Sequence, residues 1–173
     1  MANIVLIGMP GCGKSTVGVL LAKALQMDFV DTDIVLQQQQ GKKLQEIIDQ
    51  VGNDAFLKTE EDCVRGLECD QTVVATGGSV VYGKEAMRRL HENGLVVYIR
   101  LPYEEIERRL SNLATRGVTL KKGQTLRNLY DERIPLYEAE ADYTFEPEEG
   151  DVQETVLDLA QRLSARMEAD NGR

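Results

Sequence analysis

The residues from Gly8 to Ser15 have the types and spacing of a phosphate-binding loop. They read Gly-Met-Pro-Gly-Cys-Gly-Lys-Ser and match the pattern G-x-x-x-x-G-K-[ST] at every fixed position. Glycines let a backbone wrap closely around phosphate oxygens, and the amino end of the helix that follows adds positive potential there. In such a loop Lys14 reaches the β- and γ-phosphates of a nucleoside triphosphate, and Ser15 offers its hydroxyl to magnesium.

A glycine-rich turn without function is the alternative, and the position of the string between an apolar strand and an amphipathic helix argues against it. Cys12 lies beside Lys14, and we expect it to lend its backbone N–H rather than a redox thiol. The expected nucleotide contacts come from Gly11, Cys12, Gly13, Lys14, Ser15 and Thr16.

Two carboxylates, Asp31 and Asp33, end the second apolar segment. Residues at i and i+2 of an extended segment share a side, and open α/β sheets bind ligands at the carboxyl edge of their strands. One carboxylate would hold magnesium through water, and the other would orient a substrate hydroxyl or accept its proton. The alternative is an Asp that caps the following helix. After a phosphate-binding loop and its helix, we favour the functional interpretation.

Three further strings supply candidates for the rest of the site. Gly77 and Gly78 close another apolar segment, where a substrate or phosphate can approach the backbone, although a simple strand-to-helix turn fits equally well. Arg133 suits bidentate binding of a carboxylate or phosphate, and a surface Arg near a helix end is its alternative. Arg116 lies in a segment, 112–124, that we expect to be a mobile loop, from which it would neutralise charge in a transition state.

Short aliphatic runs that alternate with amphipathic segments must position these residues. Strands separated by helices indicate right-handed crossovers and a parallel sheet covered on both faces. The expected strands are 4–7, 28–31, 73–76, 95–99 and, more weakly, 143–145. The expected helices are 14–25, 44–51, 54–67, 84–91, 103–110, 125–137 and 152–167.

Composition and charge narrow the classes of protein to which this chain can belong. The chain has 173 residues, which fits a single domain, and a formal net charge of −9. A net negative protein repels nucleic acid and anionic membranes at long range, so we expect neither as a partner. The three cysteines form no C-x-x-C pair, and no apolar run approaches the roughly 18 residues of a membrane span. We expect a monomer in the cytoplasm that acts on a small molecule.

The order of these strings resembles the shikimate kinase family, with the likeness running from Ile4 to about Leu163. A switch GTPase fits less well, because the chain has no Asn-Lys-x-Asp string. The resemblance implies a three-layer α/β/α P-loop kinase fold with a five-stranded parallel sheet in the order 2-3-1-4-5. It also implies ATP and Mg²⁺ as cofactors, and phosphorylation of shikimate to shikimate 3-phosphate.

The resemblance also implies roles for single residues and regions. It places Asp31 near magnesium, Asp33 at the acceptor hydroxyls and Arg133 at the acceptor carboxylate. Arg109 resembles the family's arginine that packs on adenine, and Arg116 belongs to the lid. The substrate-binding region would span about 32–70 and the lid about 112–124. By this likeness Gly77 and Gly78 also contact the acceptor.

Two departures leave the acceptor open. Leu57 stands where the family usually has an Arg that pairs with the shikimate carboxylate, and Ser79 stands where its three-glycine motif ends in Gly. The neighbouring Lys58 is about 100° around a helix and replaces that Arg poorly. Either Arg133 suffices for shikimate, or the pocket takes another small hydroxy acid such as homoserine. A non-catalytic nucleotide-binding regulator is the remaining alternative.

Overall fold

The structure, a computed structural model, describes residues 2–111, 123–147 and 151–171. Its five strands form one parallel sheet in the order β2-β3-β1-β4-β5, which confirms the expected fold and strand order. Each expected strand is present, with bounds that differ by at most one residue. The strands are β1 (Asn3–Ile7), β2 (Asp28–Asp31), β3 (Thr72–Ala75), β4 (Gly94–Ile99) and β5 (Tyr143–Phe145).

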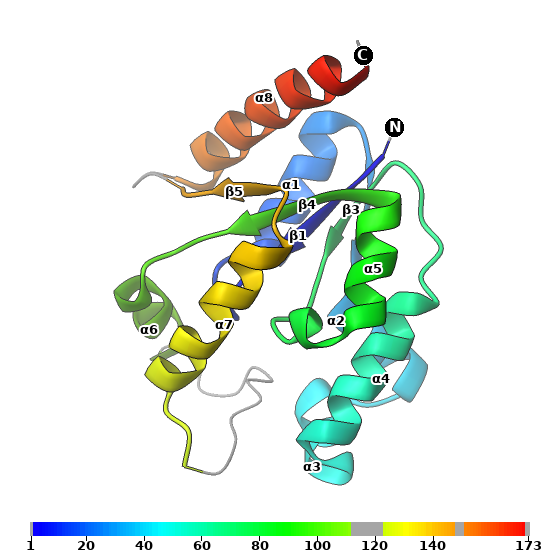
Figure 1. Ribbon diagram of the computed structural model, residues 1–173, viewed down its shortest axis with the longest axis vertical. Helices are drawn as coiled ribbons and strands as arrows, with labels where there is room; N and C mark the ends of the chain where they lie inside the picture. The colour runs from blue at the N-terminus through cyan, green and yellow to red at the C-terminus, as the bar shows by residue number, and fades with distance from the viewer. Residues whose placement is uncertain (1, 112–122, 148–150, 172–173) are drawn as a thin grey trace.

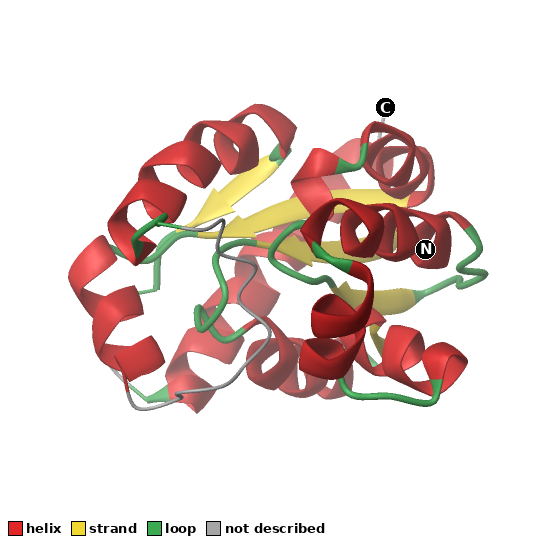
Figure 2. Ribbon diagram, turned by 90° about the horizontal axis from the view of Figure 1, so that it is seen from below, coloured by secondary structure: helices red, strands yellow, loops and turns green. Residues whose placement is uncertain are grey.

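Burial along the strands explains their residue types. All residues of β1 and β3 are buried, as is expected of central strands covered on both faces. The edge strands β2 and β5 are only partly buried, which accounts for their weaker apolar patterns. Figure 2 shows helices on both sides of the sheet.

The helices follow from the crossovers between strands. The described helices are α1 (Lys14–Leu25), α2 (Thr32–Gln40), α3 (Leu44–Val51), α4 (Asn53–Arg65), α5 (Lys84–Asn93), α6 (Tyr103–Ser111), α7 (Leu126–Glu140) and α8 (Val152–Asn171), with a 3₁₀ turn at Val80–Tyr82. Helix α1 packs on β1, β2 and β3 and has α8 beside it. Helices α4, α5 and α7 cover the other face, as right-handed crossovers require (Figure 1).

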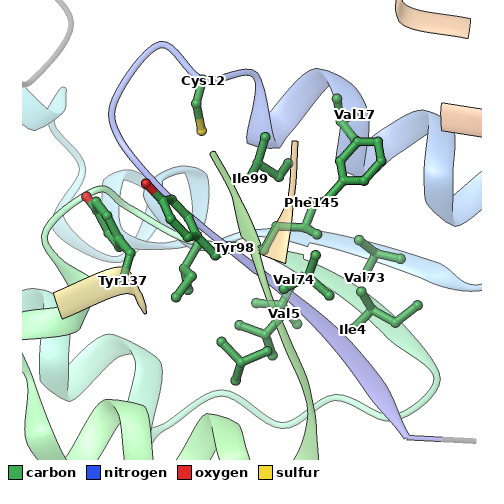
Figure 3. Packing of buried hydrophobic residues seen from close by; sticks show 14 of the residues in the cluster. Ile4, Val5, Cys12, Val17, Val73, Val74, Tyr98, Ile99, Tyr137 and Phe145 are labelled. Atoms are coloured by element: carbon green, nitrogen blue, oxygen red, sulfur yellow. The ribbon is translucent and has the colours of Figure 1, made fainter. Parts of the chain in front are cut away.

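Several helices differ from the expectations, among them α4, which ends two residues earlier at Arg65, and α8, which ends four residues later at Asn171. Helix α2 is not among the expected helices, and only a cap at Asp31 was considered, because its polar run has little apolar periodicity. Helix α7 continues three residues past the expected end at Tyr137 and carries Pro135 in its interior. Tyr137 is fully buried and its ring stacks on Tyr98 at 5.2 Å, so packing against β4 stabilises this turn despite the proline (Figure 3).

The core is mainly aliphatic and surrounds the sheet. Figure 3 shows Ile4 and Val5 of β1 among neighbouring strand residues such as Val73 and Val74, with Cys12 of the loop after β1 near the two stacked tyrosines. Among the described residues, no helix is long and apolar enough to cross a membrane.

Candidate active site

The loop after β1 has the backbone that a phosphate-binding loop requires. Gly11 and Gly13 have φ angles of 80° and 101°, in the left-handed region where a side chain would be strained. Gly13 is the residue before α1, so the N–H groups of that helix's first turn open toward the loop. The carboxyl ends of β1, β2 and β3 lie at one edge of the sheet because the three strands are parallel. Each is followed by one of the expected functional strings.

Lys14 begins α1 and its side chain lies over the loop. Its Nζ donates hydrogen bonds to the carbonyl oxygens of Gly8, at 2.8 Å, and Met9, at 3.0 Å. The side chain is buried, so the ammonium group has a fixed position within the curve of the loop. A positive charge held there, next to the amino end of a helix, is what phosphate oxygens require.

Ser15 and Asp31 bring two side-chain oxygens together beside the loop. The Ser15 hydroxyl donates to Asp31 Oδ2 at 2.5 Å, while Asp31 Oδ1 accepts from the backbone N–H of Asp33 at 3.0 Å and of Ile34 at 3.4 Å. Asp31 therefore caps α2, as the alternative interpretation expects, and its other oxygen contacts the first turn of α1, while its role toward magnesium stays a prediction. Gly18 lets α1 approach β2, because a Cβ there would lie 2.7 Å from the Phe29 ring.

These two oxygens fit a magnesium ion. Among the described residues, no group of three or more His, Cys, Asp or Glu side chains could hold a metal ion alone. Mg²⁺ needs no such group, since proteins usually hold it through one or two carboxylates together with substrate phosphates and water. Ser15 and Asp31 supply a hydroxyl and a carboxylate at the place where phosphates would lie.

Asp33 lies two residues further, in the first turn of α2 and half-buried. Burial and the neighbouring charge of Asp31 raise its pKa to about 6, while the charge of Lys14 opposes that shift. A carboxylate with a pKa just below neutral is ionised at neutral pH and close enough to it to accept a proton. Asp33 thus has the character expected of a group that orients or deprotonates an alcohol.

The glycines after β3 bring the acceptor candidates together. Gly77 donates its N–H to the buried Thr32 hydroxyl at 3.2 Å, which ties the loop to α2. A Cβ on Gly77 would lie 2.8 Å from Asp33 Oδ1. A Cβ on Gly78 would lie 3.0 Å from Arg133 Nη1, and the Gly78 carbonyl accepts from the Tyr137 hydroxyl at 2.5 Å. Backbone and charged groups from three elements therefore meet here.

Arg133 is 2% exposed, on the buried face of α7, which excludes the alternative of a surface Arg. Its guanidinium lies over the Tyr82 ring, 5.3 Å from the centroid. A buried guanidinium held between an aromatic ring and a glycine backbone has a fixed orientation. This is the geometry that bidentate binding of an anion needs.

Arg109, on α6, contacts the phosphate loop directly. Its Nη1 donates to the carbonyl oxygens of Gly11 at 3.3 Å and Cys12 at 3.4 Å, and its Nε donates to Glu105 at 2.6 Å. The arginines Arg108 and Arg109 hold the pKa of Glu105 down at about 2. An open cavity of about 690 Å³ begins here, with Gly13, Thr16, Leu101, Arg109, Pro147 and Val152 among its lining residues.

The structure brings together all the expected site residues that it describes, and Arg116 lies outside the described residues, as does most of the expected lid. It also adds Glu60 on α4, which is 3% exposed and which sequence reasoning gave no role. A signal for it existed, because Phe56, Glu60, Cys63 and Val64 recur at i, i+4, i+7 and i+8 and share the buried face of α4. This pattern was overlooked in the sequence because Glu60 is charged, and charged residues are usually exposed.

Comparison with known proteins agrees with this geometry. A protein-family model described as "Shikimate kinase" matches residues 10–164. A shikimate kinase of Clostridium botulinum (strain Eklund 17B / Type B) is 41% identical over 78% of this chain and 81% of its own length, and one of Paracidovorax citrulli is 38% identical over 96% and 92%. The solved structure of shikimate kinase from Acinetobacter baumannii in complex with shikimate has a TM-score of 0.83, at 30% identity, over 98% of this chain and 94% of that one.

Proposed function

This chain belongs to the shikimate kinase family, and from that premise we propose that it transfers the γ-phosphoryl group of ATP to a hydroxyl of shikimate, giving shikimate 3-phosphate. The observation that carries the proposal is the meeting of two half-sites at one edge of the sheet. Lys14 and its loop form the donor half, and Asp33, Gly77, Gly78 and Arg133 form the acceptor half.

In the donor half, the loop N–H groups and Lys14 bind the phosphates, and Gly11, Cys12, Gly13, Ser15 and Thr16 complete the contacts. Arg109, held by Glu105 beside the open cavity, packs against the adenine. Ser15 and Asp31 would hold magnesium, which supplies positive charge to the phosphate oxygens when it is bound. These groups position the donor and offset charge, which is most of what a protein contributes to phosphoryl transfer.

In the acceptor half, Arg133 binds the carboxylate of shikimate and thereby fixes the orientation of its ring. Asp33 accepts a hydrogen bond from the reacting hydroxyl and takes its proton as the new P–O bond forms. Gly77 and Gly78 leave room for the ring against the backbone. Arg116, from the lid at about 112–124, remains our candidate for neutralising the transferred phosphoryl group.

We propose the monomer as the active unit, because the donor and acceptor groups already meet within a single fold. The substrate-binding region, about 32–70, supplies Asp33 and borders the glycine loop. We also propose a cytoplasmic location, because Cys12, Cys63 and Cys69 are all free thiols, as is usual where thiols stay reduced.

The test is an acceptor screen with purified protein, ATP and magnesium, in which ADP release is coupled to a spectroscopic signal. Shikimate, homoserine, serine, threonine and gluconate would be compared, and the phosphorylated product identified by mass spectrometry. We expect the highest kcat/KM with shikimate. ATP consumption that stays flat with every acceptor would contradict the kinase assignment. A preference for homoserine would change the identity of the acceptor and leave the kinase assignment intact.

A further inference from the structure

Glu60 is a buried carboxyl group for which the reaction described above has no use. It lies on the buried face of α4 and is 3% exposed. The Ser79 hydroxyl, itself 6% exposed, donates to Glu60 Oε2 at 2.5 Å and fixes the orientation of the group. A buried carboxyl group in its charged form lowers the stability of the fold. Its presence at this position therefore indicates a function.

The other oxygen of Glu60 lies at the acceptor half-site. A Cβ on Gly77 would lie 2.0 Å from Glu60 Oε1 and 2.8 Å from Asp33 Oδ1, so two carboxyl groups flank the same glycine α-carbon. The next residue, Gly78, is in the same way close to Arg133 Nη1. Glu60 therefore borders the proposed acceptor half-site.

Charged and titratable groups from several elements face Glu60. They are Asp33 of α2, Lys14 of α1, Arg133 of α7 and the Cys63 thiol of α4. Burial raises the pKa of Glu60 to about 7; the Asp33 charge adds to this shift, and the Ser79 hydrogen bond and the charges of Arg133 and Lys14 oppose it. Both the neutral and the ionised form are therefore accessible near neutral pH.

The charge on Glu60 matters because the proposed acceptor carries a carboxylate. An ionised Glu60 repels that carboxylate and draws on the same positive charge of Arg133. A neutral Glu60 leaves Arg133 to the acceptor and can donate a hydrogen bond to one of its oxygens. Leu57, one turn earlier on α4, adds no charge that would offset an ionised Glu60.

We propose that Glu60, oriented by Ser79, is a positioning residue of the acceptor site and admits an anionic acceptor preferentially in its protonated form. The inference rests on the proposed function, because it requires an acceptor with a carboxylate. Ser79, which replaces a glycine of the family pattern, thereby gains a role: its hydroxyl holds the Glu60 side chain against Gly77.

The test measures the Kd of shikimate for the full chain by calorimetry, across the range from about pH 6 to about pH 8. For wild type we expect the Kd to rise about tenfold, as linkage to one group of pKa near 7 requires. Glu60→Gln keeps an acceptor for the Ser79 hydroxyl and cannot ionise, so its Kd should no longer rise with pH. The matched control is Glu68→Gln, at an exposed loop residue, which should follow wild type.

A second variant, Ser79→Ala, tests the proposal independently, through the direction in which the pH dependence of the Kd shifts. The Ser79 hydrogen bond favours the ionised carboxylate, so its loss should move the rise in Kd to higher pH. A Kd raised equally at every pH would instead indicate only a disturbed loop and would contradict the proposal. So would a Kd for Glu60→Gln that depends on pH as wild type does.

The two proposals fail in different ways. Shikimate that is phosphorylated, with the same pH dependence of Kd in wild type and in Glu60→Gln, overturns the role of Glu60 alone. Shikimate that is neither bound nor phosphorylated at any pH overturns both the acceptor assignment and the inference built on it.

Discussion

Lys14 has two features that a phosphate-binding residue needs. It is the first residue of α1, and its side chain folds over the preceding loop. At this scale the sequence was informative, because the pattern G-x-x-x-x-G-K-[ST] specifies both the glycines and the Lys. Asp33 and Arg133 were also named from residue type and place in the chain, and their roles stay predictions. Glu60 was not named, because a Glu within a helix is usually solvated and only its apolar neighbours at helical spacing reveal its burial.

Replacing Lys14 by Ala should nearly abolish turnover. The variant removes a buried positive charge that is held by the Gly8 and Met9 carbonyls, and loss of one such contact to developing charge lowers kcat by about a hundredfold to a thousandfold. The coupled ADP-release assay measures this directly. Lys23→Ala, at an exposed position of the same helix, should leave kcat unchanged. Near-normal turnover of Lys14→Ala would contradict the donor half-site.

Replacing Leu57 by Arg should improve the use of shikimate. Residues 57 and 60 are three apart on α4, so an Arg at 57 can reach Glu60 and add a positive charge for the acceptor carboxylate. A charge-assisted contact of about 1.5 kcal/mol would raise kcat/KM for shikimate about tenfold. Ala55→Arg adds the same charge at an exposed position of α4 and serves as the control. An unchanged kcat/KM would argue against this placement of residue 57.

At the scale of elements, the site depends on three parallel strands that end together and on the loops after them. Gly18 lets α1 lie close to Phe29, which brings Ser15 to Asp31. The apolar runs predicted the strands well, because central strands of a parallel sheet are buried on both faces. Helix α2 was missed, because its cap at Asp31 and its contacts to α4 stabilise it more than apolar periodicity does.

Gly77→Ala tests the loop after β3. The new Cβ would lie 2.0 Å from Glu60 Oε1 and 2.8 Å from Asp33 Oδ1, so both carboxyl groups must move. A shift of about 1 Å at such a group can lower kcat/KM by about a hundredfold, and we expect that loss with shikimate. In Gly66→Ala the Cβ comes no closer than 3.5 Å to its neighbours, so this control should stay active. An active Gly77→Ala variant would place the acceptor elsewhere.

For the molecule as a whole, the strand order, the layers and the donor half-site were predictable, because they follow from crossover handedness and from one specific motif. The residues of the proposed acceptor half could be named singly from the sequence, but the balance of charge among them could not. Which charges lie within contact of one another depends on packing between α2, α4 and α7, and no local pattern encodes it. That balance has a consequence for the stability of the whole fold.

The free energy of unfolding should record the cost of burying Glu60. Its folded pKa of about 7 is above the ordinary 4.5, so the folded chain binds more protons than the unfolded chain between these values. Stability contributed by this group is therefore present below about pH 4.5 and lost as pH rises through about 7, by about 3 kcal/mol in total. Glu60→Gln cannot ionise, so it should gain about that much relative to wild type between about pH 4.5 and about pH 8.

Denaturant unfolding of both proteins at the two pH values measures this gain, and the titrating groups that do not face Glu60 cancel in the comparison because both proteins share them. Glu68→Gln, at an exposed residue, should show no such change. A difference between wild type and Glu60→Gln that is equal at both pH values would mean that Glu60 ionises as easily in the folded chain as in the unfolded one. In that case its place beside Asp33 would carry no energetic cost, and the pocket would hold both carboxylates charged.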